Sequence, residues 1–200
     1  MNTKSFLTAE WRDLIMANYC IHPDLLSAYI PAKTELDFFD DKCYVSLVGF
    51  MFRDVRVRGL RIPMHTDFPE INLRFYVRFK TNNEWRRGVV FIKEIVPKRA
   101  ITLIANTFFG ERYVTMPAMH KRKQEGGLLT VSCVWKSDSW NELVVTADEK
   151  KHPLRENSEE EFITQHFWDY TSLSRKRTGE YHVSHPAWEY LPGNQVRCKM

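Results

Sequence analysis

The sequence predicts a mainly β fold, a barrel or a sandwich, and three observations lead to it. Aromatic residues, which favour strands, are abundant, with 13 Phe, 8 Tyr and 6 Trp. About ten short segments alternate in polarity or are β-rich, and turn residues separate them at near-regular spacing. Only one stretch carries a full helix signal. With 200 residues, the chain is expected to form a single domain over residues 1–200.

The first expected strand covers residues 10–21. Ile15, Ala17, Tyr19 and Ile21 alternate along it. A helical stripe through the same segment ends on a polar residue, so the strand fits better.

A short helix is expected next, over residues 23–29. Pro23 lies in its first turn and Pro31 ends it. An Asp-Asp turn then leads into residues 43–52, which are apolar and β-rich, and a buried strand is expected there.

The middle of the chain is expected to be a series of strands. The polar residues 81–83 are typical of a hairpin turn, and Pro97 interrupts the chain once more. The expected strands are residues 54–59, 70–79, 85–96, 100–107 and 112–116.

The last third continues this pattern. A Glu-Gly-Gly turn precedes an expected strand over residues 128–136, and a Ser-Asp-Ser turn leads into another over residues 140–147. Two further strands are expected near the end, at residues 170–174 and 180–183.

The clearest helix signal begins at Ser158. Glu161 completes a capping box with Ser158, and three glutamates lie in the first turn, where the helix dipole favours them. Phe162, Ile163 and Phe167 are expected to supply the buried face, with His166 beside them.

Composition argues against several functional classes. The net charge of +4 is small, and the basic triplets at residues 121–123 and 175–177 lie beside turn residues, so we expect solvated loops rather than a nucleic-acid site. No stretch reaches the roughly 18 apolar residues of a spanning helix, and no signal peptide is visible. The four cysteines form no C-x-x-C pair and are expected to be free thiols. We therefore expect a cytoplasmic protein without a membrane partner, a metal or a cofactor.

Several motifs carry a family resemblance along nearly the whole chain. They are WRDL at 11–14, HPDLL at 22–26, YVSLVGF at 44–50, IPMH at 62–65, EINLRFYV at 70–77, RGVVFIKE at 87–94, Pro97, Met116-Pro117 and VSHPAW at 183–188. In these motifs the chain resembles the YqjF-like family of uncharacterised bacterial proteins, a branch of the acetoacetate decarboxylase-like superfamily. The resemblance implies a cone-shaped, mostly antiparallel β-barrel with a few flanking helices, whose interior serves as a small-molecule pocket.

The resemblance also allows a test for decarboxylase chemistry. In the best-known members a lysine forms a Schiff base, and an adjacent cation and a desolvated pocket lower its pKa; this is the standard example of an activated lysine. The counterpart here is the segment 109–114, FGERYV, which contains no lysine. Arg112 and Tyr113 stand near where the lysines would be, and neither forms a stable imine. We therefore expect no decarboxylase activity.

The strand over residues 70–79 carries the main candidate site. Glu70, Asn72, Arg74 and Tyr76 alternate with apolar residues, so they share one strand face. Either this face is wet, as is common for antiparallel strands, or it lines a ligand site inside the barrel. In the second case the four apolar residues between them pack outward. Arg74 would bind a carboxylate, and Glu70 would hold Arg74 or act as an acid or base.

Three further residues are candidates beside this strand. Lys93, if buried, is the one replacement for an imine lysine, although a charge at a strand end is more often solvated. His65 could reach the same opening as Glu70 or could merely cap a turn. Arg112 is a candidate ligand contact, and Tyr113 joins Glu70 and Lys93 as a candidate catalytic group.

A histidine pair near the end of the chain does not point to a metal. His182 and His185 are three residues apart, which on a strand places the two rings on opposite faces, and no third ligand is evident. The expected role of His185 is in a turn, with Trp188 packing beneath it.

The sequence predicts a pocket for a small acidic or carbonyl-bearing organic ligand. The alternatives are a lyase-type enzyme with a displaced catalytic group, and a structural or regulatory module whose pocket is collapsed. Whether any reaction is catalysed stays open, as does assembly into a homo-oligomer.

Overall fold

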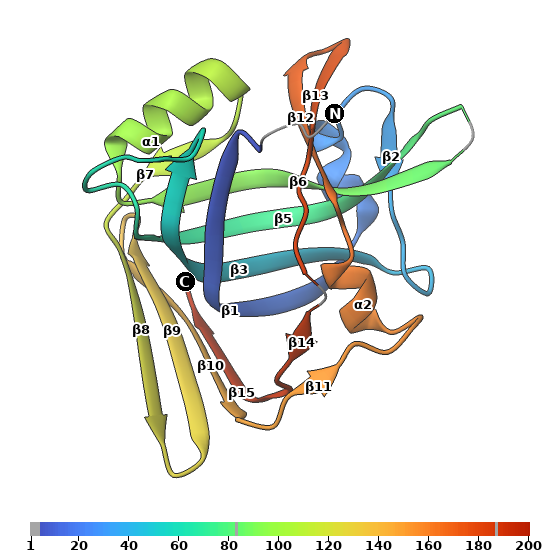
Figure 1. The fold of residues 1–200 in the computed structure, drawn as a ribbon. Helices are drawn as coiled ribbons and strands as arrows, with labels where there is room; N and C mark the ends of the chain where they lie inside the picture. The colour runs from blue at the N-terminus through green and yellow to red at the C-terminus, as the bar shows by residue number, and fades with distance from the viewer. Residues whose placement is uncertain (1–4, 83, 187) are drawn as a thin grey trace.

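The computed structural model describes residues 5–82, 84–186 and 188–200, and they form a mainly β fold (Figure 1). The largest sheet has nine strands. Its main path runs through β1 (Leu7–Ile21), β3 (Cys43–Val57), β5 (Phe68–Lys80), β6 (Trp85–Val96), β12 (Trp168–Ser174) and β13 (Arg177–His182). Three short strands pair beside this path, β2 (Thr34–Leu36) with β5, β4 (Leu60–Arg61) with β3 and β7 (Tyr113–Thr115) with β6.

The remaining strands form two smaller sheets. The second sheet runs in the order β15 (Gly193–Lys199), β10 (Trp140–Asp148), β9 (Leu128–Lys136) and β8 (Ala118–Glu125). A two-stranded sheet joins β11 (His152–Pro153) to β14 (Glu189–Tyr190). In the part of the chain that the structure describes, β1 and β13 end the path of the large sheet without pairing with each other, so the expectation of a closed barrel is not confirmed.

The helices are short. They are η1 (Pro23–Tyr29), α1 (Arg99–Ile104), η2 (Ala105–Phe109) and α2 (Glu159–Thr164). Among the described residues, none of the helices has the length and apolar character needed to cross a membrane. The cysteines are free thiols as expected, with Cys43 and Cys133 buried and Cys20 exposed.

The capping box predicted for α2 is half confirmed. Ser158 Oγ accepts from the backbone N–H of Glu161 at 3.2 Å. The Glu161 carboxylate accepts from the backbone N–H of Asn157 at 2.6 Å, one residue before its expected partner. Phe162 and Ile163 are buried, as the amphipathic pattern predicted.

The prediction of a strand over residues 100–107 is wrong, because this segment forms α1 and η2. Its β-branched residues suggested a strand, but two local contacts favour the helical form. Asn106 exchanges hydrogen bonds of 2.9 Å with the backbone N–H and C=O of Tyr113. Gly110 ends the helical segment at φ 70, a conformation that glycine adopts without strain.

The prediction of a solvated loop at residues 121–123 is also wrong, because the triplet lies on β8. This strand is at an edge of the second sheet, where charged side chains discourage pairing with other chains. The β8–β9 hairpin turns at Gly126 and Gly127, whose φ angles of 60 and 79 suit a two-residue turn. The strand β15 was not predicted, because its polar sequence carries little alternation.

β5 is the central strand of the large sheet, and both of its faces are buried. Ile71 packs against the second sheet, in a cluster with Val131, Cys133 and Leu143. Further along β5, Phe75 packs in a second cluster with Leu26 of η1. The apolar face therefore does pack away from the polar one, but it lies mainly beneath a second sheet and η1.

A β-bulge between β5 and β6 changes which residues of β6 share a face. Leu73 pairs with Lys93 and Arg74 pairs with Phe91, so Ile92 is the extra residue. Simple alternation from Val89 would place Lys93 on the face of Tyr76. The bulge instead pairs Glu94 with Asn72 and turns Lys93 to the opposite face.

Candidate functional site

The polar face of β5 lies inside the protein. Glu70 is 2% exposed, Asn72 3% and Tyr76 1%, and Arg74 is half-buried. The interpretation of this face as a wet outer surface is therefore wrong. A strand face of this polarity inside a protein needs hydrogen-bond partners for each group.

Glu70 has two donors within reach. Asn72 Nδ2 donates to its Oε1 at 2.9 Å, and the Tyr113 hydroxyl donates to its Oε2 at 2.9 Å. Burial raises the pKa of the Glu70 carboxyl to about 7, although these two hydrogen bonds and the nearby Arg74 oppose the shift. The carboxyl is thus poised between its two protonation states near neutral pH.

Three more carboxyl groups gather around Glu70, and the four together are called the acidic cluster: Glu70, Glu94, Glu111 and Asp169. Burial raises the pKa of Glu111 to about 7, and the Glu70 charge adds to the shift. Burial and the neighbouring carboxylates also hold the pKa values of Glu94 and Asp169 well above their usual range. Like charges in a desolvated site cannot all ionise, so the cluster holds protons at neutral pH.

Arg74 is the cation of this interior, but it is not hydrogen-bonded as expected. Its Nη2 donates to the backbone C=O of Ile163 at 3.4 Å and approaches the sulfur of Met16 at 4.0 Å. Its Nε is buried without a hydrogen-bond partner among the described residues. The expectation that Glu70 holds Arg74 is corrected, because Asn72 and Tyr113 occupy the Glu70 oxygens.

Tyr76 belongs to a second polar group at the other end of the strand face. Its hydroxyl lies 2.6 Å from Ser46 Oγ, and its ring lies 4.7 Å from the His166 ring. His166 Nε2 lies 3.5 Å from Asp37, which also accepts from Arg87 Nε at 2.7 Å. Burial lowers the pKa of His166 to about 4, so this imidazole is neutral at pH 7.

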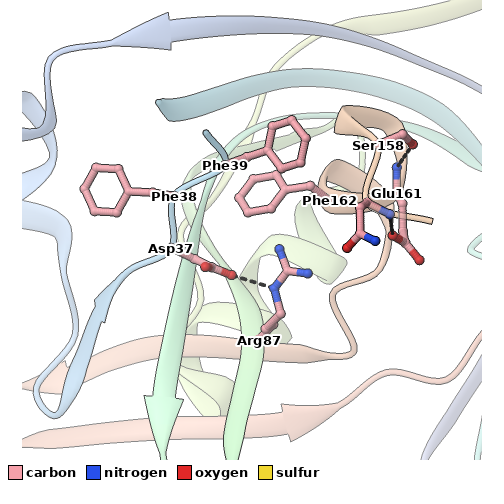
Figure 2. A pocket seen from close by; sticks show the side chains of 8 residues that line it. Asp37, Phe38, Phe39, Arg87, Ser158, Glu161 and Phe162 are labelled. Carbon is pink, nitrogen blue, oxygen red and sulfur yellow. Dashed lines mark hydrogen bonds and ion pairs between the residues drawn. The ribbon is translucent and has the colours of Figure 1, made fainter. Parts of the chain in front are cut away.

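A cavity of about 240 Å³ opens beside this second group (Figure 2). Its lining residues are Asp37, Phe38, Phe39, Arg87, Asn157, Ser158, Glu161 and Phe162. None of the four predicted β5 residues lines it. Phe162 lies between the cavity and the interior. The centre of its ring is 5.4 Å from the centre of the Tyr76 ring and 5.3 Å from that of His166.

Lys93 and His65 lie away from the acidic cluster, and Arg112 meets it through its backbone, whose C=O accepts from the Glu94 N–H at 3.1 Å. Lys93 is exposed, because the bulge at Ile92 turns it outward, so it cannot serve as a buried imine lysine. Arg112 places its guanidinium 5.5 Å from the centre of the Tyr29 ring. His65 Nδ1 lies 2.9 Å from the Pro63 carbonyl, the turn-capping alternative that the sequence left open.

The histidines near the end of the chain pack as aromatic rings. The His185 ring stacks on the Phe167 ring with 4.9 Å between the ring centres, and His185 Nδ1 lies 2.9 Å from the Pro186 carbonyl oxygen. His182 meets Trp168 edge to face at 5.0 Å. Within the described ranges, no three His, Cys, Asp or Glu side chains are arranged to hold a metal ion.

The interior contains polar and charged residues that the sequence did not single out. Glu94 and Glu111 lie inside the motifs RGVVFIKE at 87–94 and FGERYV at 109–114 and were not singled out there. Asp169, Asp37 and Arg87 had no motif of their own. The shared signal is a charged residue inside an otherwise apolar strand, as in IKEIV at 92–96 and WDY at 168–170. A charged residue is seldom fully buried unless it is paired.

Several buried polar atoms around Glu70 have no hydrogen-bond partner in the part of the chain that the structure describes. Asn72 Oδ1, Glu94 Oε2, Asp169 Oδ1 and Arg74 Nε are buried and have no hydrogen-bond partner among the described residues. Burying one such group without a partner costs about 1–3 kcal/mol. A bound polar molecule would satisfy these atoms.

Comparison with solved structures places the fold. An acetoacetate decarboxylase from Legionella pneumophila matches with a TM-score of 0.61 and 16% identity, over 99% of this chain and 83% of that one. The enduracididine biosynthesis enzyme MppR, complexed with the condensation product of pyruvate and imidazole 4-carboxaldehyde, matches with a TM-score of 0.60 and 13% identity, over 90% of this chain and 66% of that one. An acetoacetate decarboxylase-like enzyme from Sphingomonas wittichii RW1 matches with a TM-score of 0.58 and 14% identity, over 91% of this chain and 78% of that one. At these identities the likeness concerns the fold alone.

Sequence comparison identifies the family. The uncharacterised protein YqjF of Bacillus subtilis (strain 168) is 34% identical over 100 residues, which are 50% of this chain and 40% of that protein. The family model described as DUF2071, an uncharacterised conserved protein, matches residues 8–200. This match spans almost the whole chain. The chain therefore belongs to the DUF2071 family of uncharacterised conserved proteins, and its fold is that of acetoacetate decarboxylase-like structures.

Proposed function

We propose that the acidic cluster, together with Arg74 and Asn72, binds a small organic molecule that bears a carbonyl or carboxylate group. The observation that carries this proposal is the set of buried, unpartnered polar atoms around Glu70. A closed structural core would place apolar side chains there, because unpaired buried polar groups destabilise a fold.

Arg74 is the group suited to the oxygen atoms of such a ligand. Its guanidinium is half-buried and its Nε points to no protein acceptor among the described residues. A guanidinium presents a planar fork of donors that fits a carboxylate or a carbonyl oxygen. A neighbour with this fold, MppR, has been solved with pyruvate bound, which supports a keto acid as the first class to test.

The ligand would enter past α2. The cavity of about 240 Å³ ends at Phe162, and Ile163 in the same helix accepts the hydrogen bond from Arg74. Displacement of this six-residue helix would connect the cavity to Arg74. Helix α2 buries two side chains, Phe162 and Ile163, and the Tyr44 hydroxyl donates to Glu159 Oε2 at 2.9 Å, so few contacts would have to open for it to move.

A ligand screen by thermal shift tests this proposal. The panel contains 2-oxo acids, 2-hydroxy acids and simple ketones, and a ligand at 100 times its Kd adds about 2.7 kcal/mol to the stability of the folded state. Arg74→Gln should abolish the shift. Arg78→Gln is the matched control, because Arg78 is on the same strand but its guanidinium pairs with Glu35 in solvent. A panel without any stabilising compound would favour a collapsed interior without a ligand.

Turnover of the bound ligand is the second candidate function, and the Glu70–Tyr113 pair favours it. Burial raises the pKa of Glu70 to about 7, which suits a general acid or base near neutral pH. Chemistry of this kind moves a proton and needs no imine. Incubation of the ligand in deuterated water, followed by NMR, would detect exchange at carbon atoms next to the carbonyl, and Glu70→Gln should stop it.

A further inference from the structure

We propose that the ligand of the acidic cluster carries a protonated amino group, whose N–H donors meet Asn72 Oδ1, Glu94 Oε2 and Asp169 Oδ1. This inference rests on the proposed function for the location of the ligand, and it adds the chemical class. It predicts a small amino compound, such as an amino acid, rather than a simple acid or ketone.

The hydrogen-bond inventory of the interior is unequal. Of the four unpartnered atoms around Glu70, Asn72 Oδ1 is an acceptor, and Glu94 Oε2 and Asp169 Oδ1 are acceptors when their carboxyl groups are ionised; Arg74 Nε is a donor. A carboxylate or carbonyl ligand supplies acceptors only, so it would satisfy Arg74 and leave Asn72 Oδ1 and the ionised carboxylates unpaired. An ammonium group supplies three donors and no acceptor, which complements the acceptors that remain.

Asn72 gives evidence that does not depend on the charged groups. Its side chain is 3% exposed, and its Nδ2 donates to Glu70 Oε1 at 2.9 Å. This bond directs Oδ1 away from Glu70, and the cross-strand partner of Asn72 is Glu94. Among the described residues, a buried, neutral amide oxygen therefore stands unpartnered on the strand pair that carries Glu94, where a donor of the ligand would satisfy it.

The charges of the interior favour the same class of ligand. Four carboxyl groups face one guanidinium, because Lys93 and Arg112 point elsewhere. Burial raises the pKa values of all four carboxyls, and neighbouring carboxylates add to the shift at Glu94, Glu111 and Asp169, so the cluster favours its protonated forms. An ammonium ion would restore the ionised forms and gain strong charge-assisted hydrogen bonds. The described side chains hold no arrangement for a metal ion in its place.

The test is a matched series of three-carbon acids measured by NMR titration on the intact chain. Alanine, lactate and pyruvate share a carboxylate and differ only in an ammonium, a hydroxyl or a carbonyl at the second carbon. Ethylammonium is the fourth probe and carries the ammonium alone. The inference predicts that alanine binds at least about tenfold more tightly than lactate and pyruvate.

Two variants locate the effect. Glu94→Gln keeps the shape of the side chain and removes its charge, so it should reduce the preference of alanine over lactate to less than about threefold. Glu142→Gln is the control, because Glu142 lies on β10 and pairs with Arg197 at 2.8 Å. It should leave the preference unchanged. Circular dichroism confirms that each variant is folded before the titration is interpreted.

The outcomes separate this inference from the proposed function. Equal or tighter binding of lactate or pyruvate would overturn the ammonium inference and leave the proposed function standing. Binding of ethylammonium, with the three acids silent, would support the ammonium inference and overturn the carbonyl or carboxylate ligand. An alanine preference that survives Glu94→Gln, or the absence of binding by all four probes, would overturn the inference.

Discussion

The Tyr113 hydroxyl donates a hydrogen bond of 2.9 Å to Glu70 Oε2, and it joins β7 to the first residues of β5. Burial and the surrounding carboxylates raise the pKa of Tyr113 well above its usual range, so the phenol keeps its proton and acts as the donor. The pair places a fixed donor beside a carboxyl group that titrates near neutrality. Its geometry allows specific variants to be predicted.

Tyr113→Phe should raise the pKa of Glu70 further. The hydrogen bond from Tyr113 favours the carboxylate form, so its loss leaves burial less opposed. Stability should fall by about 1 kcal/mol, the net value of one hydrogen bond. A ¹³C NMR titration of the glutamate carboxyl groups measures the first effect, and urea unfolding measures the second. Tyr181→Phe serves as control, because the Tyr181 hydroxyl contacts the Phe109 carbonyl instead. An unchanged or lower pKa of Glu70 would contradict this relationship.

The contribution of Glu70 to the free energy of unfolding should decrease as pH rises from about 4.5 to about 7. The pKa of this carboxyl is 4.5 when solvated and about 7 in the folded chain, because burial disfavours its charge. The folded state therefore binds the proton more tightly, so the contribution is full below pH 4.5 and is lost as pH passes 7. A shift of this size corresponds to about 3 kcal/mol.

Glu70→Gln isolates this contribution. Wild type and variant are unfolded with urea at several pH values, and the difference in their free energies of unfolding cancels the carboxylates elsewhere whose pKa values are lowered, such as Asp37. Wild type should lose stability relative to the variant between pH 5 and 8. A difference that stays constant over this range would show that Glu70 does not titrate there.

Glu70→Ala should destabilise the protein, and a carboxylate ligand should raise the melting temperature of the variant no more than that of wild type. The substitution leaves Asn72 Nδ2 and the Tyr113 hydroxyl without their acceptor, and each buried orphan costs about 1–3 kcal/mol. Arg74 does not lose a hydrogen bond, because it makes none with Glu70 among the described contacts. Melting temperatures with and without acetate test this. Full rescue by acetate would indicate that Glu70 and Arg74 are partners after all.

Phe162→Leu should accelerate ligand exchange with little change in affinity. Phe162 lies between the cavity and the Tyr76 side of the interior, so a smaller side chain lowers the barrier for entry and exit together. Ligand-exchange NMR measures both rates. Phe38→Leu is the control, because Phe38 lines the cavity but is 43% exposed. Equal exchange rates in wild type and Phe162→Leu would place the entrance elsewhere.

Borohydride treatment in the presence of acetoacetate should give no mass adduct. Imine formation needs a lysine whose pKa is lowered in a desolvated site, and Lys93 is exposed. Intact-mass spectrometry is the measurement. A reduced adduct on Lys93 would promote a Schiff-base mechanism and overturn the exclusion of decarboxylase chemistry.

The sequence predicted the strand face at the centre of the site but not its partners. The alternation over residues 70–77 is a local signal, and it placed Glu70 and Asn72 on the correct face. The bulge at Ile92 depends on how β6 meets β5, which no local pattern reveals, and it decides that Glu94 rather than Lys93 enters the cluster. Asp169 comes from β12, far along the chain, so its proximity follows only from the tertiary fold.

The errors in the fold have a related cause. Strand propensity fails to predict a segment that a few specific contacts stabilise in another form. Asn106 hydrogen-bonds the backbone of Tyr113 and stabilises a helical segment that is rich in strand-forming residues. Polar edge strands such as β8 and β15 carry no alternation, because much of their surface is solvated. Strands buried on one or both faces, such as β5 and β9, were predicted well because burial imposes a pattern, whereas the two strands expected at 43–52 and 54–59 are one strand, β3.

The measurement that tests the account most directly is the carboxyl ¹³C titration of Glu70 in the intact chain, first alone and then with saturating alanine. The account predicts that burial holds the pKa of Glu70 at about 7 in the free protein, and that alanine moves this resonance and lowers the pKa. A Glu70 resonance that titrates as a solvated carboxyl near the ordinary value of 4.5, and that does not respond to alanine, pyruvate or lactate, would contradict it.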